Sequence, residues 1–293
     1  MRSDSDGIGE VMYEKYWGLT EAPFENVPDP SFLYESPQHK EALSRMLYGI
    51  SRRKGCIMLS GEVGSGKTTL ARTLLQSLPP ENYEVAIIEN PRLSPSLFIQ
   101  EIIYQFIGQA EGKNKIDLLH SLNRILFKNL AAEKDSVIII DEAQLIGDKS
   151  TFEELRLLLN FQLNNRFLLT LILMGQPELR DVVGAIPQFE QRIAIRYHLT
   201  RLNHDETVKY IGYRLKRAGL ARNVFTTEAI EKIYHYSDGI PRKINNICDM
   251  GLLVGWSVKA TSIDSKIIAN LIDESVDGTD IRHYQKPRAH QQA

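Results

Sequence analysis

A glycine-rich loop is the first stretch whose residue types and spacing point to chemistry. Residues 61–68 read GEVGSGKT and match the phosphate-binding pattern G-x-x-x-x-G-K-[ST] without a gap. Glycines let a backbone wrap a phosphate with its N–H groups, a lysine reaches the outer phosphates, and a hydroxyl after it can bind Mg²⁺. We therefore predict a nucleotide site formed by Gly61, Glu62, Val63, Gly64, Ser65, Gly66, Lys67, Thr68 and Thr69.

Two acidic residues provide the second half of such a site. Asp141 and Glu142 follow the apolar run VIII. Burying a carboxylate at the end of a strand costs free energy unless a cation binds to it. We therefore predict that Asp141 binds Mg²⁺ together with Thr68. Glu142 can orient and deprotonate a water molecule. The two halves together favour hydrolysis of a nucleoside triphosphate over binding alone.

A polar residue at the end of a later apolar strand is a third candidate. Gln176 follows FLLTLILMG. In an open parallel sheet the carboxyl ends of the strands line the ligand crevice. We predict that this amide holds the attacking water or the γ-phosphate, with a turn residue before Pro177 as the alternative.

Strands that alternate with helices must position these residues. The pattern predicts a parallel α/β sheet with a helix between most pairs of strands. The expected strands are 56–61, 83–90, 136–144, 167–176 and 197–202, and the expected helices are 37–53, one from the glycine loop to Leu78, 95–110, 116–132, 150–163 and a short one before the last strand.

The pattern changes after about Leu202. Helices are expected at 204–219, 227–237, 241–257 and 264–275 with no strand between them, which predicts a small all-helical domain. We expect Gly239 or Asp238 to cap the third of these helices. The predicted organisation is a disordered tail at 1–12, an α/β core at 13–202 that includes an aromatic and proline-rich segment at 13–36, a helical lid at 203–275 and a flexible tail at 276–293. Met12 is an alternative to Met1 as the start.

Composition excludes several classes of protein. The chain has 293 residues and a net charge of −2, so it is not a polycation that coats nucleic acid. Its two cysteines, Cys56 and Cys248, show no metal-ligand spacing, which fits a reducing cytosol. The apolar runs are too short to span a bilayer.

Several motifs together resemble one family. The sequences YWGLTEAPFENVPDPSFLYESPQHKEAL, NPRLSP, DEAQ, EELRLLLN, GQPELR and GIPRKINNICD occur in this order. They resemble the AAA+ ATPases of the ExeA type, also called general secretion pathway protein A, over about residues 13–273. The resemblance implies a P-loop AAA+ core with a parallel five-stranded sheet and a helical lid, an Mg²⁺-dependent ATPase activity, and assembly into a homo-oligomer.

The resemblance also implies roles for residues that spacing alone does not assign. Arg192 is similar to an arginine finger, which enters the ATP site of a neighbouring subunit, and Arg196 is the alternative. Arg242 is similar to the sensor arginine that reaches from the lid to the γ-phosphate. Tyr34 and Gln38 are similar to the wall on the adenine side, with plain packing as the alternative.

The chain departs from the family in length. ExeA-type proteins often continue into a membrane helix and a peptidoglycan-binding region, so the resemblance covers the ATPase portion only. We expect an oligomeric assembly ATPase of a cell-envelope secretion or export system, cytoplasmic or peripheral at the inner membrane through a partner. The alternatives are a DNA-associated ATPase that regulates transposition, since residues 190–222 hold eight Lys/Arg against three Asp/Glu, and a nucleotide-gated scaffold that hardly turns over.

Overall fold

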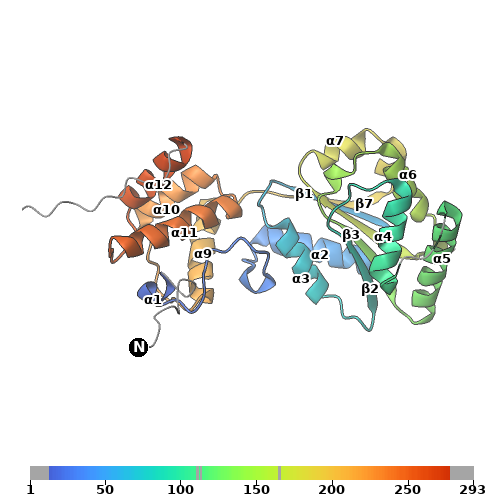
Figure 1. Ribbon diagram of the computed structural model, residues 1–293, viewed down its shortest axis with the longest axis horizontal. Coiled ribbons are helices and arrows are strands. Elements are labelled where there is room, and N and C mark those ends of the chain that lie inside the picture. Colours follow the sequence, from blue (N-terminus) through green and yellow to red (C-terminus); the bar gives the residue numbers. More distant parts are fainter. Residues whose placement is uncertain (1–12, 110–111, 113, 164–165, 278–293) are drawn as a thin grey trace, which may run out of the picture. The chain divides into compact units, whose positions relative to one another are not determined.

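The computed structural model describes residues 13–109, 112, 114–163 and 166–277 (Figure 1). The expected tails at 1–12 and from 278 onward lie outside the described residues. The chain forms two compact units, an α/β unit of Val27–Arg201 and a helical unit that joins the segment up to Asn26 with the chain from Leu202. Within the described residues, no helix combines the length and apolar character needed to cross a membrane.

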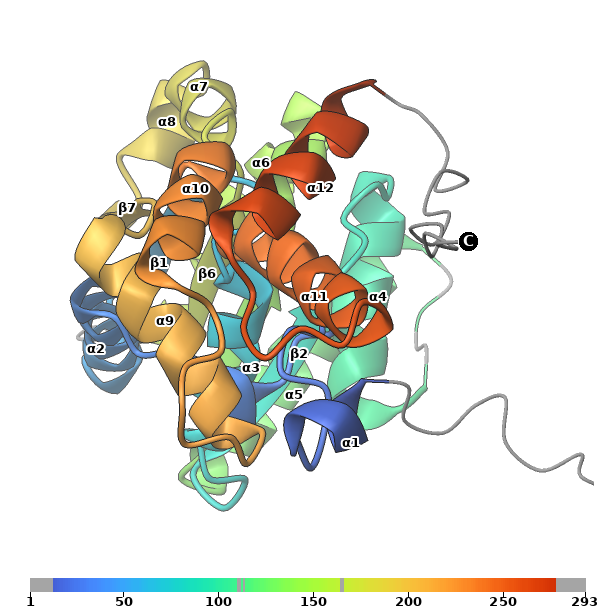
Figure 2. The ribbon, with the colours of Figure 1, turned by 90° about the vertical axis from the view of Figure 1, so that its left-hand side faces the viewer.

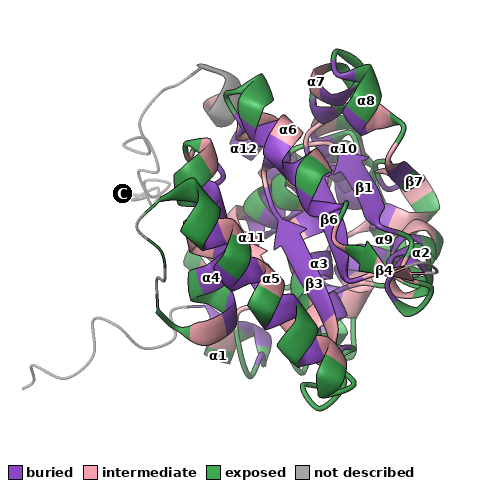
Figure 3. Ribbon diagram, turned by 90° about the vertical axis from the view of Figure 1, so that its right-hand side faces the viewer, coloured by how far each residue is buried: buried purple, intermediate pink, exposed green. Residues whose placement is uncertain are grey.

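A five-stranded sheet with parallel pairing forms the centre of the α/β unit, as the alternating pattern predicted. The spatial order is β2-β3-β6-β1-β7. Every residue of β1 and β6 is buried, which explains their continuous apolar runs (Figure 3). The strands are β1 (Cys56–Gly61), β2 (Tyr83–Ile88), β3 (Asp135–Ile140), β6 (Leu169–Gly175) and β7 (Ile193–Leu199).

Helices cover both faces of this sheet. Alternate residues of a strand point to opposite faces, so Ile57 packs with α2 and α3 while Met58 packs with α4, α5 and α6. The sheet is therefore the middle layer of three. The helices of this unit are α2 (Pro37–Ser51), α3 (Lys67–Gln76), α4 (Pro95–Ile107), α5 (Lys115–Ala131), α6 (Lys149–Leu158), α7 (Leu179–Gly184) and α8 (Pro187–Glu190), with 3₁₀ turns η1 (Pro30–Phe32) and η2 (Ala143–Leu145).

The last strand and one hairpin differ from the expectation. Strand β7 begins at Ile193 and not at Tyr197, because this edge strand alternates buried and exposed residues and has no continuous apolar run. Helix α6 ends at Leu158, and the last two residues expected to belong to it form β4 (Gln162–Leu163), which makes an antiparallel hairpin with β5 (Arg166–Phe167). Alternating apolar and polar residues suit such a short strand.

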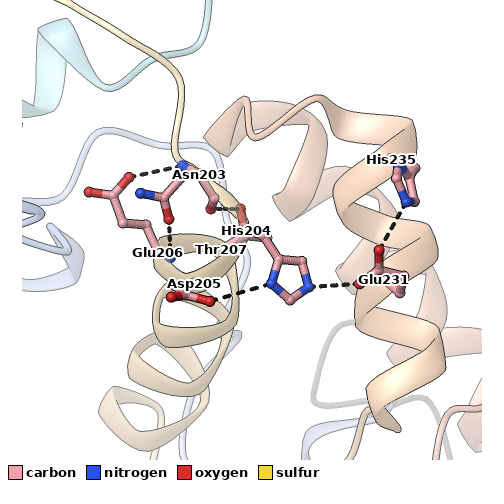
Figure 4. Close-up of polar contacts among 7 residues, drawn as sticks. All are labelled: Asn203, His204, Asp205, Glu206, Thr207, Glu231 and His235. Carbon is pink, nitrogen blue, oxygen red and sulfur yellow. Dashed lines mark hydrogen bonds and ion pairs between the residues drawn. The ribbon is translucent and has the colours of Figure 1, made fainter.

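Four helices make up residues 204–277 of the helical unit together with their connecting turns, as predicted (Figure 2). They are α9 (His204–Arg217), α10 (Thr227–Ser237), α11 (Pro241–Ser257) and α12 (Ser265–Asp277). A reciprocal cap between Asn203 and Glu206 begins α9. His204 Nε2 then lies 2.8 Å from Glu231 on α10, and His235 contacts the other oxygen of the same carboxylate (Figure 4).

The cap expected before α11 was wrong. Asp238 adopts a left-handed conformation with φ 51° and ends α10, and the N-cap of α11 is Ile240, whose side chain makes no capping hydrogen bond. Gly239 also has a positive φ, and a Cβ there would lie 1.9 Å from the carbonyl oxygen of Leu202. Both residues therefore form the tight turn between two helices.

The first half of the aromatic and proline-rich segment belongs to the helical unit, whereas the sequence placed it with the core. Trp17, at the end of α1 (Glu14–Trp17), donates its indole N–H to the carbonyl of Leu252 at 2.9 Å. The buried guanidinium of Arg214 donates to the carbonyls of Pro23 and Glu25. Because these contacts join residues far apart in the chain, the sequence pattern could not reveal them.

Candidate functional site

The glycine loop lies between the buried strand β1 and helix α3, as the phosphate-binding pattern requires. Gly64 and Gly66 have φ values of 77° and 99°, which side chains rarely adopt. Helix α3 begins at Lys67 directly after Gly66, and the N–H groups of its first turn have no partner within the helix. The loop therefore presents backbone donors and the positive end of a helix dipole to one place.

The buried ammonium of Lys67 is folded onto this loop. Its Nζ donates to the carbonyls of Gly61 at 2.8 Å and Glu62 at 2.9 Å, and the side chain is only 5% exposed. Among the described residues, the buried hydroxyl of Ser65 in the same loop has no hydrogen-bond partner. A buried polar atom without a partner is costly, and a polar ligand in the loop would remove that cost.

The two predicted magnesium ligands are in contact. Thr68 Oγ1 donates to Asp141 Oδ2 at 2.8 Å, and Asp141 Oδ1 accepts the backbone N–H of Glu142 at 2.8 Å. In the part of the chain that the structure describes, no group of three His, Cys, Asp or Glu side chains is arranged as a metal site. A hydroxyl and one carboxylate nevertheless fit Mg²⁺, which takes few protein ligands and completes its shell with water and phosphate oxygens.

Two amides hold the carboxylate of Glu142. Its Oε2 accepts hydrogen bonds from Nε2 of Gln144 and from Nε2 of Gln176, the latter at 3.1 Å. Gln144 Oε1 in turn accepts the backbone N–H of Gln176 at 3.0 Å. A Cβ on Gly175 would lie 2.5 Å from that oxygen, so glycine leaves the space for Gln144. Gln144 belongs to the DEAQ motif, but its spacing alone predicts no role for it.

His39 is a second residue that the sequence analysis missed. Its buried ring contacts the hydroxyl of Ser36 through Nδ1 at 2.7 Å and the carbonyl of Ser65 through Nε2 at 3.1 Å. A Cβ on Gly66 would lie 3.1 Å from the same Nε2. His39 therefore supports the glycine loop from behind. The only available signal was its place in SPQHKEAL.

Gln38, the residue next to His39, bridges α2 and the chain after β7. Its amide accepts from the backbone N–H of Thr200 at 2.8 Å and donates to the carbonyl of Arg201 at 3.1 Å. Tyr34 is half-buried nearby in sequence. These contacts give Gln38 a structural role, and the adenine-side role of both residues stays a prediction.

A polar chain runs beside the loop from β1 to β7. Arg180 Nε donates to Ser60 Oγ at 3.1 Å, and Ser60 Oγ contacts His198 Nδ1 at 3.0 Å. Burial lowers the pKa of His198 from its ordinary value of 6.5, and the charges of Arg180 and Lys67 lower it further, against the effect of Glu62. The neutral imidazole is therefore favoured, with Nδ1 as the acceptor.

The two candidate finger arginines differ in their contacts. Arg196 forms an ion pair with Glu190 at 2.9 Å and also donates to the carbonyl of Glu190. Within the described residues, the Arg192 side chain donates a single hydrogen bond, to Asn160 Oδ1 at 3.1 Å, and Arg192 lies directly before β7. Because β7 is parallel to β1, Arg192 lies at the amino edge of the sheet, about 20 Å from the loop that follows β1. It therefore cannot serve the loop of its own chain.

Arg242 is the remaining predicted residue. It is exposed in the first turn of α11, in the helical unit. Lys243 beside it is also exposed. The role of Arg242 toward the γ-phosphate stays a prediction.

Known proteins are similar to this chain in sequence and in fold. Residues 50–183 match the family model described as AAA domain. General secretion pathway protein A of Aeromonas hydrophila is 41% identical over 84% of this chain. The chain spans 45% of that relative's length. The resemblance that the motifs indicated is thus confirmed.

Solved structures agree on the fold. The Aeropyrum pernix ORC2 protein, in ADPNP and ADP complexes, matches with a TM-score of 0.60 and 18% identity over 85% of this chain and 72% of that one. Drosophila ORC bound to DNA matches with a TM-score of 0.62 and 14% identity over 94% and 71%. The chain therefore has the AAA+ fold, and its sequence belongs to the AAA domain family that the motifs indicated.

Proposed function

We propose that this chain is an Mg²⁺-dependent ATPase that converts ATP and water to ADP and phosphate. One observation carries the proposal. The carboxyl edge of one sheet brings together the phosphate-loop residues Lys67 and Thr68 and the two carboxylates Asp141 and Glu142. Binding alone would not need a carboxylate fixed by two amides beside the phosphate loop.

The chain's own residues would divide the work as follows. The amides of residues 61–69 and the ammonium of Lys67 bind the phosphates. Glu142, held by Gln144 and Gln176, orients the water whose oxygen forms a bond to the γ-phosphorus while the bond to the β–γ bridging oxygen breaks. Mg²⁺, when held by Thr68 and Asp141, would neutralise charge on the phosphates.

Glu142→Gln tests the catalytic step. We expect phosphate release to fall by at least about a hundredfold, because an amide cannot accept the proton, while ATP binding is kept. Glu81→Gln, an exposed carboxylate outside the site, is the matched control. Retained hydrolysis in Glu142→Gln would refute the assigned role, and no hydrolysis by the unaltered chain would favour the scaffold alternative.

We propose further that Arg192 acts on the ATP of a neighbouring copy in a homo-oligomer. Its place at the amino edge supports action between chains. Arg192→Ala and Lys67→Ala should each be inactive alone, whereas their mixture should recover activity, since one supplies an intact loop and the other an intact arginine. Arg196→Ala is the control. No recovery on mixing, with mixed oligomers formed, would contradict action between chains.

Arg242 is proposed as the arginine that senses the γ-phosphate. The supporting feature is its exposed position at the start of α11, where the helix dipole and its own charge attract the same anion. Arg242→Ala should slow hydrolysis more than it weakens ADP binding. Equal effects on both would remove the proposed role, and Lys243→Ala is the matched control.

The proposed biological role is to assemble or regulate a cell-envelope secretion or export system, on the cytoplasmic side through a partner. The support is the name and 41% identity of the Aeromonas hydrophila relative. Affinity capture with Glu142→Gln as bait should recover envelope-machinery proteins. Capture of none, in a strain where the system is active, would count against this role.

The basic stretch 190–222 gives less support to a DNA-associated role than its composition suggested. Arg196 and Arg201 have acidic partners, Glu190 and Glu62. Arg214 is buried against backbone carbonyls. These cations serve the protein's own structure, so a nucleic-acid role must rest on another surface.

A further inference from the structure

A strongly basic pocket lies at the edge of the sheet opposite the nucleotide loop. Its volume is about 980 Å³, and it is lined by Arg52–Lys54, Asn160 and the two arms of the β4–β5 hairpin. We call it the basic pocket. The first segment directly precedes β1 and the hairpin precedes β6, and these two parallel strands are neighbours. The pocket is therefore at the amino edge, about 20 Å from the loop that follows β1.

The backbone frame of the pocket is fixed. The N–H of Lys54 donates to the carbonyl of Gly49 at 2.9 Å, at the end of α2. On the other side, the N–H of Leu168 donates to the carbonyl of Phe161 at 2.9 Å. The ring of Phe167 packs against Gly55, where a Cβ would lie 3.1 Å away. The walls are thus held by the ends of sheet and helix and not by a loose loop.

Most of the pocket's cations have no acidic partner among the described residues. No carboxylate is among the described residues that line the pocket. Arg53 pairs with Asp135 at 2.7 Å, but within the described residues no ion pair is formed by Arg52, Lys54 or Arg166. Like charges gathered in one pocket repel one another, and an anion that binds there removes this repulsion.

The other lining groups indicate which anion fits. Guanidinium groups bind phosphate through two parallel hydrogen bonds. The amide of Gln162 and the NH₂ group of Asn160, whose Oδ1 accepts from Arg192, can pair with the edge of a base. The half-buried ring of Phe167 offers a stacking surface. An acidic peptide would use only the cations. The pocket therefore has groups that can contact the phosphates, the edge of a base and the face of a base.

We propose that the basic pocket binds single-stranded nucleic acid, with Arg52, Lys54 and Arg166 on its phosphates and Phe167 against a base. The volume is at the upper end for ligand pockets and exceeds the needs of one nucleotide, which favours a strand over a free nucleotide. This inference does not depend on the proposed secretion role or on the catalytic assignments.

Fluorescence anisotropy with a labelled DNA strand of about 12 nucleotides tests the proposal. Saturating ADP and Mg²⁺ keep the strand out of the glycine loop. With three phosphates neutralised, the logarithm of the affinity should fall with the logarithm of salt concentration with a slope of about 2. Absence of saturable binding at low salt would overturn the proposal.

Variants locate the binding. The double variant Arg52→Gln/Arg166→Gln should lower the slope by about 1.4. The control Lys128→Gln/Lys149→Gln removes the same charge from exposed helical positions and should leave the slope unchanged. Phe167→Leu should weaken binding at least about fivefold at constant slope. Equal slopes in the two double variants would overturn the proposal.

Competition and self-association distinguish the other occupants. Polyglutamate of equal charge should compete poorly, and equal competition would identify an acidic protein segment instead. A dinucleotide that binds as tightly as the strand would identify a free nucleotide. If Arg52→Gln/Arg166→Gln lowers the oligomeric state but not strand binding, the pocket is an interface between copies. Each of these three results would overturn the proposal.

Discussion

Replacing His39 by alanine should weaken the α/β unit and loosen the phosphate loop together. The imidazole makes hydrogen bonds to Ser36 and Ser65, each worth about 1 kcal/mol. Its removal from a site that is 4% exposed adds a cavity cost of about 1 kcal/mol or more. We expect the free energy of unfolding to fall by about 3 kcal/mol. Loss of support at the loop should also weaken ADP binding by at least about fivefold.

Urea unfolding followed by far-UV circular dichroism measures the first effect. The two tryptophans, Trp17 and Trp256, both lie in the helical unit, so their fluorescence reports on that unit and serves as an internal reference. His120→Ala removes an exposed histidine from α5 and should change stability by less than about 0.5 kcal/mol. If His39→Ala and His120→Ala unfold at the same urea concentration, the two hydrogen bonds contribute nothing and the reasoning is refuted.

Three further outcomes follow from the geometry. Gln144→Leu should lower kcat while ADP affinity is kept, because Glu142 loses one of its two amide donors; an unchanged kcat would show that Gln176 suffices. Asn160→Asp should lower kcat more than Asn160→Ala, since a carboxylate holds Arg192 more tightly than an amide, and equal kcat values would contradict this. Folding lowers the pKa of His198. The stability that the neutral His198 contributes is therefore complete above pH 6.5 and is lost as the pH falls below 6.5. A His198→Gln variant with the same acid sensitivity in urea unfolding would exclude that histidine.

The sequence was sufficient for features that depend on neighbouring residues. The apolar runs of β1, β3 and β6 predicted buried parallel strands, and the spacing from Gly61 to Thr68 predicted the loop between strand and helix. Such patterns are local because a strand buried on both faces needs an unbroken apolar run. The order β2-β3-β6-β1-β7 was not predicted, since it depends on pairing between distant segments.

Residues whose contacts join distant parts of the chain could not be predicted from the sequence. His39 meets Ser65 across 26 residues, and Gln144 meets Gln176 across 32. Each single residue has an ordinary explanation in its own helix or turn. The basic pocket is a similar case, because Arg52–Lys54 and Arg166 come together only through the pairing of β1 with β6. Tertiary pairing, and not local preference, decides these sites.

Helix α6 connects a residue at the carboxyl edge of the sheet with a residue at the amino edge. Helix α6 follows the η2 turn, which contains Gln144, and spans about 15 Å before it ends next to Asn160. Gln144 holds the Glu142 carboxylate at the carboxyl edge, and Asn160 lines the basic pocket and holds Arg192 at the amino edge. Strands β1 and β6 link the same two edges by shorter stretches of chain, since Lys54 precedes β1 and Gly61 ends it, and Phe167 precedes β6 and Gln176 follows it. Helix α6 is the link that connects the support of Glu142 to the residue that holds Arg192.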